Sequence, residues 1–143
     1  MTPDCVIAEA RGWIGTPYRQ GASLRGVGCD CLGFVLGVHN ALCASHRRET
    51  WPDGAAWRLI GMRDEKLLEA LDRRFLRRAG PDFQAGDLIA FRWRGDLIAS
   101  HLAIATGPET MIHAHSRATV AEIALSLPWR RRLVAIYSFA ETL

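Results

Sequence analysis

The chain has 143 residues, of which 49% are hydrophobic and 23% are charged, and its formal net charge is +3. This length fits one domain over residues 1–143, and so much apolar surface excludes a globally disordered chain. No apolar run approaches the ~18 residues that a membrane-spanning helix needs, so we expect no insertion into a membrane. The small, dispersed positive charge argues against nucleic acid as a substrate, because nucleic-acid-binding proteins gather basic residues on one face.

The cysteines do not indicate a disulfide-bonded protein. The first 18 residues contain charged side chains and lack the apolar stretch of a secretory signal, so we expect synthesis in the cytoplasm. Thiols in that compartment stay reduced. We therefore expect four free cysteines, namely Cys5, Cys29, Cys31 and Cys43.

The first half of the chain predicts helices. Thr2 and Pro3 are typical of a helix start, and residues 15–17 would end this first helix. One face of it carries the apolar residues Val6, Ala10, Trp13 and Ile14. Residues 18–28 contain three glycines and predict a loop.

Two further helices are expected. Residues 30–44 are apolar nearly all round, which predicts a buried second helix. After an expected loop at 45–61, the leucine-rich stripe of residues 64–79 predicts a third, amphipathic helix. Gly80 and Pro81 would end that helix.

From Asp87 onward apolar and polar residues alternate, which predicts short strands. The expected strands cover residues 87–93, 98–106, 110–115, 119–123 and 133–139. The basic run Arg130–Arg132 between the last two is expected to be a solvated loop. Helices followed by antiparallel strands indicate the α+β class.

Cys31 is the first candidate for chemistry, because it follows Asp30 at the start of the buried helix. Backbone N–H groups and the helix dipole at such a position stabilise a thiolate, which is the nucleophilic form of cysteine. Two simpler interpretations stay open. Cys31 can be a small core residue, and Asp30 can be the cap of the helix.

Three histidines form the second candidate. If residues 107–109 make a three-residue loop, Thr106 faces Thr110, and His101, His113 and His115 share one face of the two strands. A shift of one residue would move His101 to the other face. In the expected register a base and an orienting group come together, with His113 or His115 as the orienting residue. Together with a thiol at a helix start, such groups form the general arrangement for nucleophilic catalysis.

A zinc site is the main alternative use of these residues. Cys29 and Cys31 are one residue apart rather than two, which does not match the usual spacing of paired zinc ligands. His39 and His46 lie on or near the buried helix and are the other candidate ligands. We expect neither a metal nor a cofactor.

Four segments of the chain resemble the NlpC family of cell-wall cysteine peptidases. In the family's order they are G-T-P-Y-R at 15–19 with D-C-L-G at 30–33, then Q-A-G-D-L-I-A-F at 84–91, H-L-A-I at 101–104 and M-I-H-A at 111–114. Leu32 stands where the family usually has serine. Residues 20–22 are Gln-Gly-Ala where the family usually has Trp-Gly-Gly.

The resemblance implies a papain-like α+β fold, with the helix that carries Cys31 packed on a C-terminal antiparallel sheet. It also implies cleavage of an amide bond in the peptide stem of peptidoglycan, usually between D-glutamate and the diamino acid. Cys31 would be the nucleophile, His101 the base and His113 the residue that orients it. Tyr18 and Asp30 would stabilise the oxyanion and bind the substrate.

A narrower resemblance concerns peptidases encoded with phage tails and gene transfer agents. It rests on D-C-L-G, on the segment around Trp51 and Trp57, and on W-R-R-R at 129–132. It implies other phage-like tail proteins as partners and a final location in a virion or tail particle. The alternatives are an acyltransferase or amidase on the same fold, or a tail component that binds cell wall without catalysis.

Overall fold

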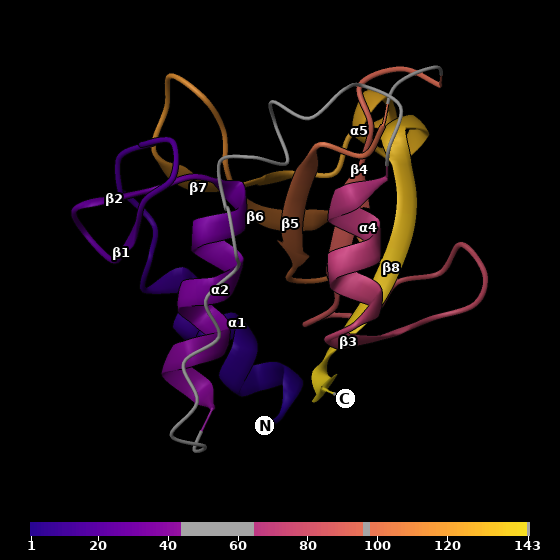
Figure 1. Cartoon of the computed structure of the whole chain (residues 1–143), viewed down its shortest axis with the longest axis horizontal. Helices are drawn as coiled ribbons and strands as arrows, with labels where there is room; N and C mark the ends of the chain where they lie inside the picture. The colour runs from indigo at the N-terminus through magenta and orange to yellow at the C-terminus, as the bar shows by residue number, and fades with distance from the viewer. Residues whose placement is uncertain (44–64, 96–97, 143) are drawn as a thin grey trace.

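The computed structural model describes residues 1–43, 65–95 and 98–142, with helices first and a sheet after them (Figure 1). The described helices are α1 (Pro3–Arg11), α2 (Cys31–Leu42), α4 (Lys66–Asp72) and α5 (Leu127–Arg132). Two short strands, β1 (Ser23–Leu24) and β2 (Gly28–Cys29), precede α2. None of the described helices is long and apolar enough to cross a lipid bilayer.

Six strands form one antiparallel sheet in the order β3-β8-β4-β5-β6-β7. They are β3 (Phe75–Arg77), β4 (Leu88–Phe91), β5 (His101–Ala105), β6 (Thr110–Ala114), β7 (Val120–Ala124) and β8 (Leu133–Thr142). The α+β class and the N-terminal helices packed on a C-terminal sheet are therefore confirmed.

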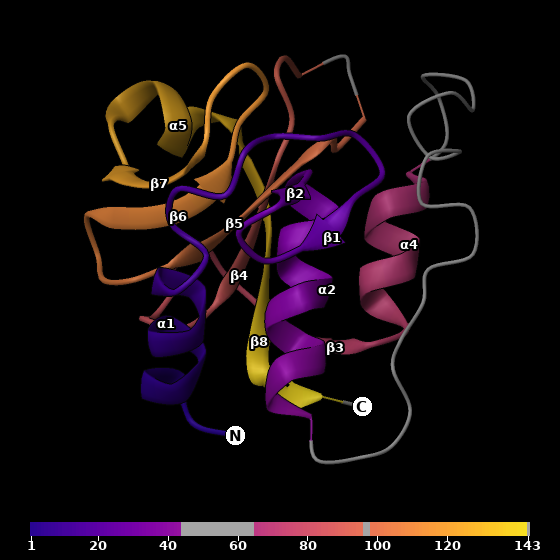
Figure 2. The same cartoon turned by 90° about the vertical axis from the view of Figure 1, so that its left-hand side faces the viewer.

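The core lies between the helices and one face of the sheet. Figure 2 looks onto α1 and α2, which pack side by side with the sheet behind them. Phe34 and Val38 of α2 are buried there with Leu102 and Ile104 of β5. Ala103 lies between those two strand residues and points to the other face, since side chains alternate along a strand. A smaller apolar cluster covers that face and includes Ala103.

The expected register of the β5–β6 hairpin is confirmed. Ile104 pairs with Ile112 in the antiparallel ladder, and the backbone N–H of Thr106 donates to the carbonyl oxygen of Thr110 at 3.0 Å. Residues 107–109 form the connecting loop. The histidines of the two strands therefore share one face, as the sequence predicted.

The third helix is shorter than predicted. It runs from Lys66 to Asp72, and Phe75–Arg77 form strand β3 against β8 instead of continuing the helix. The backbone of β8 offers hydrogen-bonding partners to β3, and Phe75 is buried with its ring 5.3 Å from that of Phe139. Sheet pairing and burial therefore override a helical pattern. The predicted start at residue 64 and the predicted loop at 45–61 lie outside the described residues.

The predictions for residues 18–28, for Arg130–Arg132 and for Ile14 are wrong. Residues 18–28 contain β1 and the first residue of β2, which pair with each other, and Arg130–Arg132 form the last turn of α5 rather than a loop. Ile14 is 47% exposed because α1 ends at Arg11, before Ile14 can join the buried face. Ile7 is buried in its place. The observed strands match the predicted ones within a few residues at each end, apart from β3 and the β1–β2 pair.

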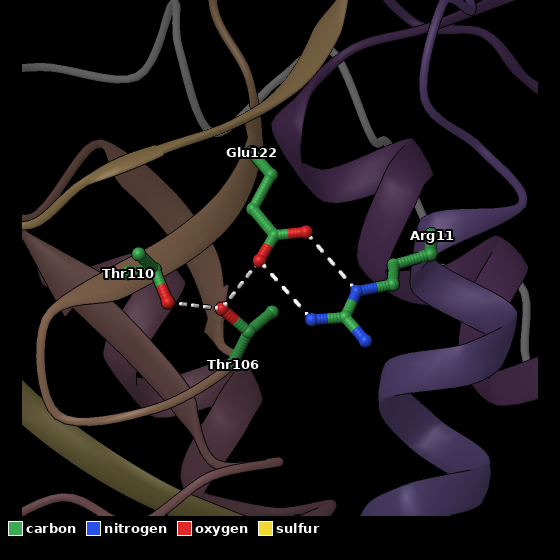
Figure 3. A network of polar contacts seen from close by, with 4 residues as sticks. All are labelled: Arg11, Thr106, Thr110 and Glu122. Atoms are coloured by element: carbon green, nitrogen blue, oxygen red, sulfur yellow. Dashed lines mark hydrogen bonds and ion pairs between the residues drawn. The ribbon is translucent and has the colours of Figure 1, made fainter.

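A polar network fastens α1 to the far end of the sheet (Figure 3). The guanidinium of Arg11 donates to both oxygens of Glu122, at 3.1 and 3.2 Å. The hydroxyl of Thr106 donates to Glu122 at 2.9 Å and lies 2.6 Å from the hydroxyl of Thr110. The hydrogen bonds from Arg11 lower the pKa of the Glu122 carboxyl. The pair is exposed, so it fixes the position of α1 more than it adds stability.

Residues 15–18 lie along the outer edge of β7. The backbone N–H of Gly15 donates to the carbonyl of Val120 at 2.9 Å, and that of Tyr18 donates to Ala118 at 3.1 Å. Val120 in turn donates to Thr16 at 2.9 Å. The segment that leads from α1 towards β1 is thus held against the last strand of the sheet.

The close contact of α2 with Trp13, which follows α1, depends on Gly37. The indole of Trp13 is buried, and a Cβ placed on Gly37 would lie 2.1 Å from it. The same ring packs edge-on against Phe34 at 6.0 Å between centroids. Glycine at this helical position therefore leaves the space that the indole fills.

We expect Gly37→Ala to lower the free energy of unfolding by about 1–3 kcal/mol, because overpacking a filled core costs that much. The higher helix propensity of alanine offsets at most ~1 kcal/mol of it. Urea unfolding measures the change. Gly95→Ala is the matched control, since a Cβ there meets nothing within 4 Å. Equal effects in the two variants would contradict the prediction.

Candidate active site

Asp30 caps the helix that Cys31 begins. One oxygen of the Asp30 carboxylate accepts the backbone N–H of Gly33 at 2.7 Å, and the other accepts that of Gly21 at 2.8 Å. The side chain is 2% exposed. The interpretation of Asp30 as the helix cap is confirmed, whereas a contact between Asp30 and substrate stays a prediction.

The loop before the helix is packed directly on its first turn. The hydroxyl of Ser23 donates to the carbonyl of Gly33 at 2.6 Å, and the backbone N–H of Asp30 donates to Ala22 at 3.2 Å. A Cβ on Gly33 would lie 1.9 Å from the carbonyl oxygen of Ala22. Glycine two residues after Cys31 therefore has a steric cause, and the contacts fix the backbone that carries the thiol.

Cys31 lies at the N-terminus of α2 and faces the start of β5. Its side chain is buried, and its sulfur lies 4.0 Å from the carbonyl oxygen of Ser100, the residue before His101. The N-terminal end of a helix stabilises a thiolate. Leu32, which replaces the family's usual serine, is buried in the core and serves packing.

Cys29 is close in sequence but chemically different. Burial, followed by the neighbouring charges of Asp30 and Cys31, raises the pKa of the Cys29 thiol to about 12. A thiol with that pKa stays protonated at neutral pH and is a poor nucleophile. Of these two cysteines, Cys31 at the N-terminus of α2 is therefore the better candidate for the nucleophile.

His101 and His113 form a buried pair. Nε2 of His101 lies 2.8 Å from Nδ1 of His113 across the β5–β6 hairpin. Burial, and then the neighbouring His115, lower the pKa of His113 to about 4. His113 is therefore neutral near pH 7, and its Nδ1 can accept a hydrogen bond from His101. Nδ1 of His101 is then the ring nitrogen that can exchange a proton with a thiol.

His115 is adjacent to this pair, and its Nδ1 contacts the backbone. Its ring centroid lies 5.9 Å from that of His101 and 5.5 Å from that of His113. Nδ1 of His115 lies 3.2 Å from the carbonyl oxygen of Ser116, to which it can donate. Of the two candidates for the orienting role, the structure places His113 in hydrogen-bonding contact with His101.

Tyr18 lies beside the segment that leads into the start of α2. It is partly buried against the main core, and its backbone bridges to Cys29, two residues before Cys31. The N–H of Arg19 donates to the carbonyl of Cys29 at 3.0 Å. Tyr18 is thus held beside the chain that leads into α2. The participation of its hydroxyl in catalysis stays a prediction.

Two tryptophans that surround the histidines were missed as site residues. The ring centroid of Trp129 lies 5.5 Å from His101 and 5.2 Å from His113, and that of Trp93 lies 6.0 Å from His101. Trp129 belongs to α5, which the sequence did not predict. The sequence shows the W-R-R-R motif at 129–132, but nothing in its spacing places the motif beside the histidines.

A zinc site is not supported by the described part of the chain. Within it, no three His, Cys, Asp or Glu residues form a group that could hold a metal ion. His39 packs edge-on against Phe75 and Phe139, at 5.5 and 5.9 Å between ring centroids. His46, the other suggested ligand, lies outside the described residues.

A cavity of about 690 Å³ lies away from these residues, between β8, α5 and the segment that follows β3. Three arginines line it, and each already has partners. Arg78 pairs with Asp87 at 3.0 Å, Arg130 donates to the carbonyl of Leu125 at 2.9 Å, and Arg77 lies 3.6 Å from Asp72. Neither Cys31 nor the histidine pair lines this cavity.

Comparisons with known proteins identify the family of the chain and its fold. Residues 15–137 match the NlpC/P60 family, so the chain belongs to that family. The papain-like α+β fold that the sequence implied is confirmed by solved structures of the family. No curated protein gave a match.

Three solved structures illustrate the similarity. An NlpC/P60 family protein from Bacillus cereus ATCC 10987 is 22% identical, with a TM-score of 0.66, over 95% of this chain and 39% of that one. The NlpC/P60 domain of the peptidoglycan hydrolase SagA is 24% identical, with a TM-score of 0.65, over 96% and 99%. A lipoprotein-like family member from Staphylococcus aureus subsp. aureus Mu50 is 21% identical, with a TM-score of 0.64, over 96% and 41%. The chain thus spans about two fifths of the first and third proteins.

We expect His113→Asn to weaken the pH dependence of stability. The pKa of His113 is about 4 in the folded protein, below its usual 6.5, so protonation of His113 favours the unfolded chain. The free energy of unfolding that depends on neutral His113 is therefore fully present above pH 6.5 and is lost as the pH falls from 6.5 through 4. A pKa difference of this size corresponds to roughly 3 kcal/mol. Urea unfolding at pH 7, 5.5 and 4 measures it. Curves that fall equally in both proteins would show that His113 does not carry the effect.

Proposed function

We propose that the protein is a cysteine peptidase that hydrolyses an amide bond in the peptide stems of peptidoglycan. The observation that carries the proposal is the thiol of Cys31 at a capped helix start, beside the strand that begins with His101, which is hydrogen-bonded to His113. Membership of the NlpC/P60 family supports it. So does the similarity in fold to a domain of SagA, which is a peptidoglycan hydrolase.

In the proposed reaction the Cys31 thiol gives its proton to Nδ1 of His101, and the thiolate attacks the scissile carbonyl carbon. The tetrahedral intermediate collapses as the C–N bond breaks, and His101 returns the proton to the departing amine. A thioester remains on Cys31. Water, deprotonated by His101, attacks this thioester and releases the new carboxyl group and the free thiol.

Two groups are suited to stabilise the oxyanion. One is the backbone N–H of Cys31, in the first turn of α2, where the helix leaves its initial N–H groups without intrahelical partners. The other is the hydroxyl of Tyr18, whose backbone is fixed beside Cys29. We propose the bond between D-glutamate and the diamino acid as the one cleaved, on the strength of the family resemblance.

His113 would act on His101 and not on substrate. Because it is neutral near pH 7, its Nδ1 accepts a hydrogen bond from Nε2–H of His101 and keeps that imidazole in one orientation and tautomer. An imidazolium formed during the reaction keeps this hydrogen bond. The pair therefore supplies a base whose proton-accepting nitrogen, Nδ1 of His101, is defined before the substrate arrives.

An acyltransferase or amidase on the same fold is the second candidate, because the same residues form the same thioester. The difference lies in the acceptor, which is an amine or alcohol in a transferase and water in a hydrolase. A non-catalytic wall-binding component is the third, and the buried and oriented histidine pair argues against it.

We expect Cys31→Ala to reduce the release of stem-peptide fragments from purified peptidoglycan by roughly 10⁴-fold or more, since it removes the nucleophile. His101→Ala should cost more activity than His113→Ala, because removing a base costs more than removing its orienting partner. Mass spectrometry of the released fragments measures the rates and identifies the bond.

Cys29→Ala is the matched control, because Cys29 is an equally buried thiol two residues away. It should digest peptidoglycan at nearly the wild-type rate. Turnover by Cys31→Ala together with an inactive Cys29→Ala would show that the wrong thiol was chosen. Fragments that carry a new acyl acceptor in place of a free carboxyl group would favour the transferase.

We further propose that the protein works in a phage-like tail particle, where it opens the wall of a recipient cell so that DNA can pass. The support is the sequence resemblance of D-C-L-G and of W-R-R-R at 129–132. Trp51 and Trp57, which belong to the same resemblance, lie outside the described residues. An enzyme tethered at the attachment point would act at a high effective concentration.

The tail assignment predicts that purified particles contain the protein at a few copies each. Quantitative mass spectrometry of particles, normalised to a tail protein, tests this. The alternative is an enzyme that lyses the producing cell. Particles that lack the protein, together with loss of lysis when its gene is deleted, would favour that alternative.

A further inference from the structure

We infer that Trp129 is a positioning residue for the His101–His113 pair, and this inference rests on the proposed function. Its indole covers the hydrogen bond between the two imidazoles and stabilises the protonated form of His101. Trp129 comes from α5, a different element from the strands that carry the histidines. The role therefore depends on tertiary packing.

The rings of Trp129, His101 and His113 lie close to one another. The centroids of His101 and His113 lie 5.0 Å apart, and that of Trp129 lies 5.5 Å from one and 5.2 Å from the other. The three rings therefore form a nearly equilateral triangle, in which the indole contacts both imidazoles. Trp129 is thus placed to limit the access of water to the hydrogen bond, and exclusion of water strengthens such a bond.

The indole of Trp129 also lies within cation–π distance of the His101 ring. The two ring planes are tilted by 32° with 5.5 Å between centroids, and Trp93 stacks on the same imidazole at 26° and 6.0 Å, so both indoles lie close to His101. The electron-rich face of an indole attracts a cation within about 6 Å of its centroid. A protonated His101 is such a cation, whereas His113 stays neutral. The indole thus favours the thiolate–imidazolium form of Cys31 and His101 over the neutral form.

Trp129 is itself held in place by neighbouring side chains. Its ring contacts Phe91 and Trp93 at 5.2 and 5.5 Å between centroids, and the guanidinium of Arg132 lies 5.8 Å from its centroid. The N–H of Arg130 donates to Ser126 at 3.0 Å within the same helix. An indole fixed in this way can hold a second ring in a defined orientation.

A simple packing role for Trp129 makes a different prediction. If the indole only fills space, any apolar side chain of suitable volume should preserve the reactivity of Cys31. If it stabilises imidazolium, an aromatic ring is required. The pH dependence of Cys31 reactivity separates the two, because packing alone does not change the pH at which the thiolate forms.

The experiment is alkylation of the full chain by iodoacetamide from pH 4 to pH 10, with the rate at Cys31 measured by peptide mass spectrometry. Trp129→Leu should slow alkylation at pH 6 by about tenfold, because the ion pair loses the cation–π contribution. At pH 10 the rate should match that of the wild type, since the thiolate then forms without help from His101. Trp129→Phe should restore most of the pH 6 rate.

Phe83→Leu is the matched control, because Phe83 and Trp129 are both partly buried aromatics packed on the same apolar cluster. Its profile should match the wild type. Trp129→Met has an unbranched, flexible side chain that adapts to the space left by the indole, and it tests the same loss of the ring if Trp129→Leu does not fold. A wild-type profile for Trp129→Leu or Trp129→Met, or a Trp129→Phe profile equal to theirs, would overturn the inference.

The same measurement separates this inference from the proposed function. If Cys31 of the wild type reacts at pH 6 no faster than an ordinary thiol, the proposed nucleophile is wrong and the inference falls with it. If the wild type reacts fast and the ring-free variants react equally fast, the peptidase proposal stands and the role of Trp129 is refuted.

Discussion

The arrangement of the site depends on the carboxylate of Asp30. One of its oxygens holds the first turn of α2 and the other holds the loop before that turn. A helix end leaves several N–H groups to be satisfied, and a buried cap both satisfies one and fixes where the helix begins. The direction of Cys31 towards β5 follows from that starting point. Gly33 completes the contact, because the loop carbonyl occupies the space of a Cβ.

The other half of the site depends on strand pairing. The register of β5 and β6 brings His101 and His113 within hydrogen-bonding distance, and burial keeps His113 neutral. Neither strand alone defines the pair. The acid–base geometry is therefore set by a hairpin, whereas the nucleophile is set by a helix. The contact of Cys31 with Ser100 is where the two halves meet.

The sequence predicted most of this arrangement where local patterns matched tertiary demands. The buried second helix, the hairpin register and the grouping of His101 with His113 followed from periodicity and loop length. Phe75 illustrates the limit, because it fits the helical stripe and yet joins a strand whose partner is distant in the chain. Trp129 was missed for the same reason, since only the packing of α5 brings it to the histidines. Contacts between remote segments leave no local signal.

The segment at residues 15–18 has a further consequence for how the protein behaves at high concentration. Its backbone bonds to Ala118 and Val120 occupy groups on the outer side of β7. An open edge strand is a template for pairing with another molecule, and covering it suppresses aggregation through intermolecular sheets. The stretch of chain that carries Tyr18 to the site therefore also blocks part of a sheet edge from recruiting a second copy.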